Sequence, residues 1–280
     1  MPTSILISGA TSGMGLSTAS LLAAQGYQVF AGYRSEAGRN TLEALKAQYG
    51  TAIQPLLLDV QQAQSVDLAV ASVIEQAGKL DVLINNAGYG LVASVEDGSD
   101  EEFIRQFDVN VFGVLRLARE AIPFMRQQGH GTIINIGSFL GAMALPLLTH
   151  YNASKYAVEG ITDSLRIELQ GFGIRVHTVA PGLFRTDFVS RGLSANADTT
   201  KANSAYAHIA NQLLPVISGR INQGPDPRAV AEAILKVIQD PLSPARIAVG
   251  EEAVLAEEWK RSLDPQRFEQ KVQDFFGLST

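Results

Sequence analysis

The chain has 280 residues, of which 46% are hydrophobic and 18% are charged. This composition supports a large buried core and excludes both a disordered chain and a coiled coil. The net charge of −6 argues against a nucleic-acid partner, which needs a basic face, and the absence of cysteine excludes disulfides, thiolate catalysis and a Cys-bound metal.

The N-terminus enters an apolar run at Ile5 without the basic segment and the long apolar stretch of a signal peptide. No apolar run approaches the ~20 residues that span a bilayer. The segment GAMALPLL is short and contains Pro146. We therefore expect a soluble, cytoplasmic protein with no membrane partner.

Short runs of β-branched or aliphatic residues alternate with segments of helical length. The runs are apolar on both faces, as in a parallel sheet that helices cover on both sides. This alternation predicts a doubly wound α/β fold with right-handed crossovers. The expected strands are Ser4–Ser8, Tyr27–Tyr33, Ile53–Leu58, Leu80–Ile84, Gly131–Ile136, Ile174–Ala180 and Arg246–Val249.

Helices are expected between these strands, for example over roughly Met14 to Gln25 and over Asp226–Gln239. One long helix is expected to begin after Ser99. Ser99 and Glu102 have the spacing of a capping box, and apolar residues at helical spacing follow them.

No internal repeat, low-complexity tract or linker divides the chain, so residues 1–280 are expected to form one domain. Residues 185–223 are polar and weakly periodic, which predicts a mobile covering segment. Residues 224–280 are expected to add a helix, a strand and a charged amphipathic tail.

A glycine-rich turn follows the first strand in the sequence SGATSGMG, with the spacing G-x-x-x-G-x-G at Gly9, Gly13 and Gly15. Glycine allows a tight turn and a close approach of the backbone to a ligand. The next helix offers its N-terminal N–H groups to a diphosphate. The turn, including Thr11, Ser12 and Met14, therefore predicts a dinucleotide site, although a plain βα turn is the alternative.

The end of the second strand indicates which dinucleotide is bound. A site for NAD usually has an acidic residue there, whereas this chain has Tyr33 followed by Arg34. A guanidinium suits a 2′-phosphate, so NADP(H) is favoured over NAD(H). A solvated Arg34 is the alternative. Asp59, next to Val60 after the third strand, is placed to bind an adenine amino group, unless it is an ordinary loop residue.

Tyr151 and Lys155 form a Tyr-x-x-x-Lys pair that is weak evidence alone. Other polar motifs accompany it, at or beside the carboxyl ends of expected strands, where ligands bind in open α/β sheets. These motifs are NNAG (Asn85–Gly88), NVFG (Asn110–Gly113), INIGS ending at Ser138, and PGLFRT (Pro181–Thr186).

Over about Ile5 to Thr186 the sequence resembles the short-chain dehydrogenase/reductase family, and its later half is similar to the hydroxysteroid- and retinol-dehydrogenase-like branch. The resemblance implies one Rossmann-like domain with a parallel sheet of about seven strands between two helix layers. It also implies an oxidoreductase acting on CH–OH groups with NADP(H). One departure is Ser8, where the family more often has Thr.

The resemblance implies a catalytic tetrad. Tyr151 would be the general acid/base, and Lys155, one helical turn later, would lower its pKa and bind the nicotinamide ribose. Ser138 would polarise the substrate carbonyl. Asn110 would hold a water that links Lys155 to solvent, unless it is a satisfied polar residue inside a helix.

The resemblance divides the domain into a cofactor-binding and catalytic core at 1–186, a substrate lid at 187–223 and the C-terminal part at 224–280. Thr186 would bind the carboxamide of the nicotinamide. The full expected cofactor set is Gly9, Thr11, Ser12, Gly13, Met14, Gly15, Arg34, Asp59, Val60, Asn86, Ala87, Gly88, Tyr151, Lys155, Pro181, Gly182 and Thr186.

The loops expected to line the substrate pocket contain few charges, which favours an apolar ketone, aldehyde or alcohol. Equally, these side chains could simply pack the lid onto the core. The expected substrate contacts are Ser138, Leu140, Leu145, Tyr151 and Phe184, and the wider lining is Leu91, Val92, Phe139, Met143, Leu147, Leu183 and Phe188.

Two alternatives to an NADP(H)-dependent enzyme stay open: an NAD(H)-dependent enzyme of the same type, and a non-catalytic NADP(H)-binding regulator. The four histidines show no ligand spacing, so no metal is expected. Relatives commonly pair through the helices that begin here near Ser99 and Tyr151, which suggests a homodimer or homotetramer.

Overall fold

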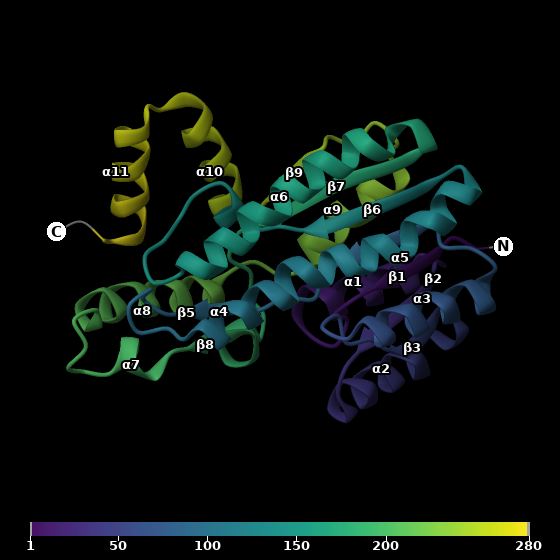
Figure 1. The fold of residues 1–280 in the computed structure, drawn as a ribbon, viewed down its shortest axis with the longest axis horizontal. Coiled ribbons are helices and arrows are strands. Elements are labelled where there is room, and N and C mark those ends of the chain that lie inside the picture. The colour runs from purple at the N-terminus through teal and green to yellow at the C-terminus, as the bar shows by residue number, and fades with distance from the viewer. Residues whose placement is uncertain (1, 279–280) are drawn as a thin grey trace.

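The computed structural model describes residues 2–278 (Figure 1). A parallel seven-stranded sheet has the order β3-β2-β1-β4-β6-β7-β9, which confirms the doubly wound α/β prediction. The strands are β1 (Ser4–Ile7), β2 (Gln28–Tyr33), β3 (Ile53–Leu57), β4 (Val82–Asn85), β6 (Gly131–Ile136), β7 (Ile174–Pro181) and β9 (Arg246–Val249). They match the expected strands to within two residues at each end.

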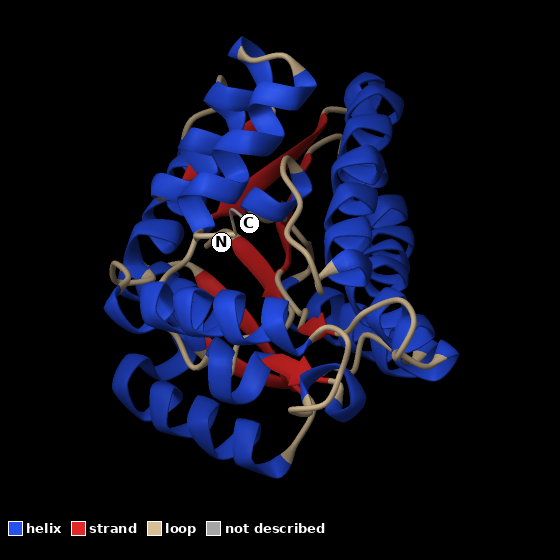
Figure 2. Ribbon diagram, turned by 90° about the vertical axis from the view of Figure 1, so that its left-hand side faces the viewer, coloured by secondary structure: helices blue, strands red, loops and turns tan. Residues whose placement is uncertain are grey.

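Helices cover both faces of this sheet, so that the red strands of Figure 2 lie between blue layers. The helices are α1 (Gly13–Ala24), α2 (Glu36–Tyr49), α3 (Ala63–Ala77), α5 (Gly113–Gln128), α6 (Thr149–Leu169) and α9 (Arg228–Gln239). One core cluster joins α1, α2 and α9 to the sheet, and another joins α3, α5 and α6 to the opposite face. In the part of the chain described, no helix is both long enough and apolar enough to cross a bilayer.

The apolar strands are explained by this double cover. All residues of β1, β4 and β6 are buried, including Ile5, Leu83 and Ile134. Burial on both faces removes the alternation of polar and apolar residues. Strand order reverses beside β1, and such a switch point leaves a crevice at the carboxyl ends of the strands.

The expected long helix after Ser99 is interrupted. Its N-terminus has the predicted capping box, since the Ser99 hydroxyl accepts from the Glu102 N–H and the Glu102 carboxylate accepts from the Ser99 N–H. Helix α4 (Asp100–Phe107) then passes into a π-helical turn (Asp108–Phe112) before α5 begins. Such wide turns recur at functional sites, and this one contains Asn110.

The covering segment is more ordered in secondary structure than the weak periodicity predicted. It contains β8 (Leu193–Ala195), α7 (Ala197–Thr200) and the 17-residue α8 (Ala207–Gln223). Pro215 lies inside α8 and obscures its helical pattern, although the buried positions of α8 have helical spacing. Strand β8 pairs in parallel with β5 (Gly90–Val92), so the segment is hydrogen-bonded to the loop after β4.

The C-terminal tail folds as α10 (Glu251–Ser262) and α11 (Pro265–Phe276), drawn in yellow in Figure 1. A third apolar cluster joins α10 and α11 to α8 and to the segment after β6. Residues 279–280, which end the predicted tail, lie outside the described residues.

Replacing Ser99 by Ala is expected to lower the free energy of unfolding by about 1 kcal/mol, because the hydroxyl that accepts from the Glu102 N–H is lost. A thermal melt should show a midpoint about 2–4 °C lower. Ser72→Ala, inside α3, is the control and should leave the midpoint nearly unchanged. Equal midpoints for Ser99→Ala and wild type would show that the cap adds no stability.

Candidate active site

One cavity of about 570 Å³ opens at the carboxyl ends of β1, β2, β4, β6 and β7. It brings together every residue of the expected catalytic, cofactor and substrate-contact sets except Asn110. Those residues are Gly9, Thr11, Ser12, Gly13, Met14, Gly15, Arg34, Asp59, Val60, Asn86, Ala87, Gly88, Ser138, Leu140, Leu145, Tyr151, Lys155, Pro181, Gly182, Phe184 and Thr186.

The glycine-rich turn at one end of the cavity fits a diphosphate. Gly9 has a φ of +66°, and a Cβ added to Gly15 would clash with the Gly9 carbonyl oxygen. Helix α1 begins after Ser12, whose side chain caps none of its N–H groups, and its first turn has no acidic residue. Its first N–H groups are therefore available to an anion.

A hydrogen-bond network ties this turn to the loop after β4. The Ser8 hydroxyl accepts from the backbone N–H of Asn86 at 3.1 Å and of Ala87 at 3.0 Å. The Asn86 amide donates to the carbonyls of Ser8 and Gly9, at 3.0 and 2.8 Å. Because only a hydroxyl is needed, serine in place of the family's usual threonine retains these bonds.

Helix α6 positions Tyr151 and Lys155 on one face, next to the end of β6. The Lys155 ammonium lies 5.8 Å from the centroid of the Tyr151 ring and donates to the Ile136 carbonyl at 2.9 Å. Ser138, two residues beyond Ile136, lies in the same wall of the cavity. The three side chains thus converge, as the sequence predicts.

Burial controls the protonation of this group. It raises the pKa of Tyr151 to about 12, and the neighbouring Ser138 hydroxyl opposes that shift. It lowers the pKa of Lys155 to about 8, and the Glu159 carboxylate opposes that shift. The lowered Tyr151 pKa expected from Lys155 is therefore not observed, because desolvation is the larger effect. At neutral pH Tyr151 holds its proton.

Asn110 supports the site from behind rather than lining it. Its side-chain oxygen accepts from the Tyr89 N–H at 3.0 Å, and its amide donates to the Tyr89 carbonyl at 2.9 Å and to Ser154 at 3.1 Å. A Cβ on Gly88 would lie 3.2 Å from the Asn110 oxygen and 3.9 Å from the Lys155 ammonium. Asn110 thus joins the loop after β4 to α6.

The other end of the cavity is apolar. Val92, Phe139, Leu140, Leu145, Leu183 and Phe188 line it as expected, together with Leu148, Leu193, Ile217 and Ile221. The expectation was wrong for Leu91, Met143 and Leu147, which do not line it. Phe184 touches the cavity but is only 2% exposed and belongs to the core cluster beneath it, so it supports the wall more than it offers contact.

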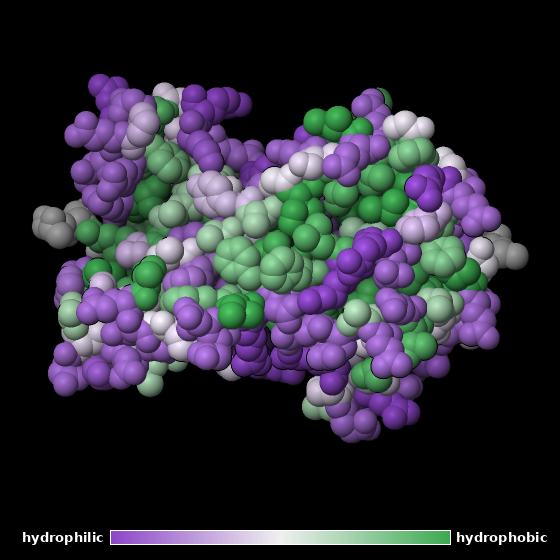
Figure 3. Space-filling model, viewed as in Figure 1, coloured by the Kyte–Doolittle hydropathy of each residue, from purple (hydrophilic) through white to green (hydrophobic). Residues whose placement is uncertain are grey.

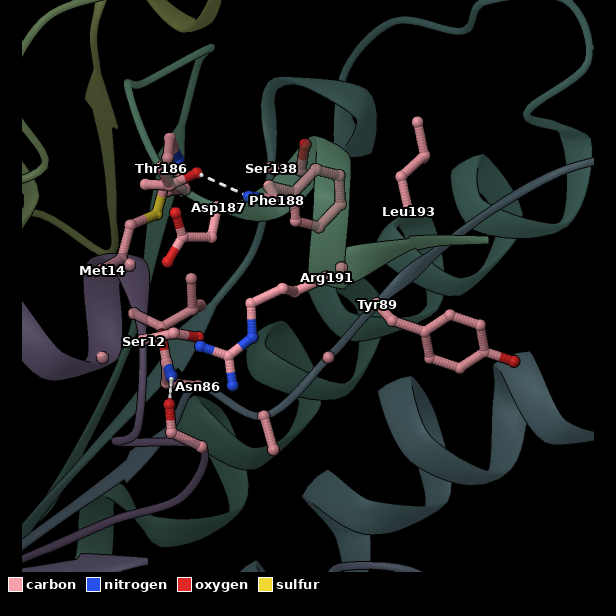
Figure 4. Close-up of a pocket in the computed structure, with 18 of the residues that line it drawn as sticks. Ser12, Met14, Asn86, Tyr89, Ser138, Thr186, Asp187, Phe188, Arg191 and Leu193 are labelled. Carbon is pink, nitrogen blue, oxygen red and sulfur yellow. Dashed lines mark hydrogen bonds between the residues drawn. The ribbon is translucent and has the colours of Figure 1, made fainter. Parts of the chain in front are cut away.

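Several lining residues were missed from the sequence, including Tyr89, Asp187 and Arg191. Figure 4 shows the Arg191 side chain extending from the covering segment toward Ser12 and Asn86. Within residues 2–278 its guanidinium has no hydrogen-bond or ion-pair partner. No local pattern indicates this position, because it depends on how a loop folds back over the glycine turn.

Known proteins match this chain over most of its length. A family model described as short chain dehydrogenase matches residues 3–196. A 3-ketodihydrosphingosine reductase from Bacteroides thetaiotaomicron is 37% identical over 250 residues, which cover 89% of this chain and 88% of that protein.

Solved structures agree with this match. A short-chain dehydrogenase from Streptomyces avermitilis has a TM-score of 0.83 and 32% identity, covering 99% of this chain and 97% of that one. An actinorhodin polyketide ketoreductase solved with NADPH has a TM-score of 0.76 and 29% identity, covering 89% and 95%. The chain therefore belongs to the short-chain dehydrogenase/reductase family of oxidoreductases.

Proposed function

We propose that this protein is an NADP(H)-dependent oxidoreductase that interconverts a carbonyl and an alcohol on an apolar small molecule. The observation that supports it best is the convergence of Ser138, Tyr151 and Lys155 in one cavity with the glycine-rich turn. Two of the matched proteins are named as reductases of keto compounds, which supports the same reaction type.

Three cations of the described chain line the cavity, and each could meet one part of an extended dinucleotide. Among the described lining residues the cations are Arg34 at the end of β2, Arg191 on the covering segment and Lys155 on α6. We assign Arg34 to the 2′-phosphate, Arg191 with the N-terminus of α1 to the diphosphate, and Lys155 to the nicotinamide ribose. When bound, the nicotinamide supplies or accepts the hydride.

Side chains of the protein then polarise the carbonyl and transfer the proton. Ser138 donates a hydrogen bond to the substrate oxygen and polarises the carbonyl. Tyr151, protonated at neutral pH, gives its proton to that oxygen as an alcohol forms. The charge of Lys155 stabilises the tyrosinate that remains, and Asn110 positions Lys155 through Ser154 and the loop at Tyr89.

The apolar end of the cavity supports an apolar substrate. Leu140 and Leu145 face it from the segment after β6, and Ile217 and Ile221 face it from α8. Such walls favour burial of hydrocarbon and disfavour a charged group without a partner. The hydroxysteroid- and retinol-dehydrogenase-like branch remains a proposal of the same kind.

A homodimer or homotetramer is proposed from the apolar surface over α4, α5 and α6. Ile104, Phe112, Leu115, Tyr156 and Ile167 are exposed there, and Figure 3 shows green side chains gathered over the middle of this face. Tyr156 and Ile167, 11 residues apart on α6, share one side of that helix. A second copy of the chain is the proposed occupant, as the resemblance to the family implies.

Replacing Tyr151 by Phe is expected to lower kcat for reduction about 10²- to 10⁴-fold, because the proton donor is lost. The assay follows NADPH oxidation across a panel of aldehydes and ketones of increasing apolarity. Tyr156→Phe, on the exposed side of the same helix, is the control and should retain activity. Undiminished turnover by Tyr151→Phe would refute the mechanism.

The same panel separates the alternatives. Turnover of only polar or anionic carbonyls would refute the apolar substrate. A protein that binds NADPH but turns over no member of a broad panel would be the non-catalytic regulator instead.

Arg34→Ala is expected to weaken NADPH binding about 10- to 100-fold and to leave NADH binding almost unchanged, because only the 2′-phosphate loses its partner. Arg191→Ala is the matched comparison and should weaken both cofactors by a similar factor. Calorimetric titration measures both Kd values. If Arg34→Ala keeps the wild-type preference for NADPH, the role given to Arg34 is wrong.

Lysine at Ile104 or at Ile167 is expected to reduce the assembly to monomers, because a charge would be buried between copies. Sedimentation analysis measures the mass. Leu242→Lys is the control, since Leu242 is 88% exposed in the loop before β9. A wild-type protein that sediments as a monomer would contradict the proposed interface.

A further inference from the structure

A half-buried ion pair lies directly behind the site and is not part of the reaction described above. Glu159 lies one helical turn beyond Lys155 on α6, and Arg246 begins β9, the edge strand of the sheet. The Arg246 Nε atom is 3.1 Å from Glu159 Oε1. Glu257 of α10 contacts the same guanidinium. The pair therefore joins α6, the sheet edge and the C-terminal helices.

The pair also encloses the backbone on both sides of Ser138. The Arg246 Nη2 atom donates to the Ser138 carbonyl at 3.3 Å. A Cβ added to Gly137 would lie 2.9 Å from Glu159 Oε1, and one added to Gly141 would lie 3.0 Å from it. Glycine at both positions lets this carboxylate pack against the turn that presents the Ser138 hydroxyl.

Glu159 is at the same time the charged group that acts most strongly on Lys155. Its attraction opposes the loss of the Lys155 proton, which burial favours. From the other elements, the neutral Ile136 carbonyl accepts from Lys155, and both Lys155 and the neutral Asn110 side chain lie beside Gly88. On α6 itself, Tyr151 is the remaining neighbour, and it is neutral below its raised pKa.

Glu159 in turn is surrounded by groups of several elements. Burial raises its pKa, and the nearby Arg246 lowers it. Thr178 of β7 offers a hydroxyl, and Asp163, one turn further along α6, adds a weaker repulsion. The Arg246 guanidinium thus opposes the protonation of Glu159 that burial favours.

We propose that Glu159 and Arg246 form a positioning pair that holds the Ser138 turn in place and preserves the positive charge of Lys155. The proposal rests on the proposed function, because it assigns these residues an effect on the groups that would perform the reaction. Neither residue lines the cavity, so both act through others.

The first test measures Lys155 directly in the cofactor-free protein. The chain has seven lysines, so ¹³Cε-lysine NMR gives few signals, and a Lys155→Met sample assigns the one of interest. Wild-type Lys155 should titrate with a pKa of about 8. In Glu159→Gln this pKa is expected to fall by about one unit, because the attracting charge is removed.

Asp163→Asn is the matched control, since it removes the same charge from the same helix at an exposed position that pairs with Arg166. It should leave the Lys155 pKa nearly unchanged. Arg246→Met keeps the carboxylate but removes the guanidinium that opposes its protonation, so the Lys155 pKa should fall by less than in Glu159→Gln. If the pair only stabilised the fold, Glu159→Gln and Arg246→Met would change the Lys155 pKa equally.

The second test is the pH profile of kcat/KM for a carbonyl that wild type reduces. Its alkaline limb should move to lower pH in Glu159→Gln and should move by less in Arg246→Met. Equal behaviour of Glu159→Gln and Asp163→Asn in either test, or a shift in Arg246→Met at least as large as that in Glu159→Gln, would overturn the proposal. If the wild-type protein reduced no carbonyl, the proposed function would be refuted instead. The NMR titration would still test the role of Glu159 and Arg246.

Discussion

The burial of one ammonium group is the constraint on which the site depends. Lys155 is only 8% exposed, and desolvation lowers its pKa to about 8. A buried cation persists only where partners compensate for lost water. The Ile136 carbonyl at the end of β6 and the Glu159 carboxylate on α6 meet that need here. Strand β6 and helix α6 must therefore pack in one fixed register.

The parallel sheet makes that register possible. All strands end at the same edge, so separate loops deliver Asn86 after β4, Ser138 after β6 and Thr186 after β7 to one cavity. The Ser8 hydroxyl holds the loop after β4 against the glycine turn, and the Asn110 side chain joins the same loop to α6. Rigid strands and helices thus place groups that no single segment could position.

Local patterns in the sequence were sufficient to predict the strands and the capping box at Ser99. They were also sufficient to place Tyr151 and Lys155 one turn apart on a helix. The features that were not predicted depend on contacts between residues far apart in the sequence. The π-helical turn at Asp108–Phe112 and the pairing of β5 with β8 depend on packing between segments. Arg191 reaches the cavity only through the fold of its loop. The sign of the Tyr151 pKa shift depends on burial, which spacing does not reveal.

In the proposed reaction, a hydride passes between a bound nicotinamide and a substrate carbon. Tyr151 transfers the proton, and the charge of Lys155 stabilises the tyrosinate. The most direct measurement uses NADPH in which both C4 hydrogens of the nicotinamide are replaced by deuterium, and analyses the alcohol by NMR. The account predicts deuterium on the carbinol carbon for wild type and little product for Lys155→Met. An alcohol without that deuterium, or equally rapid labelling by Lys155→Met, would contradict it.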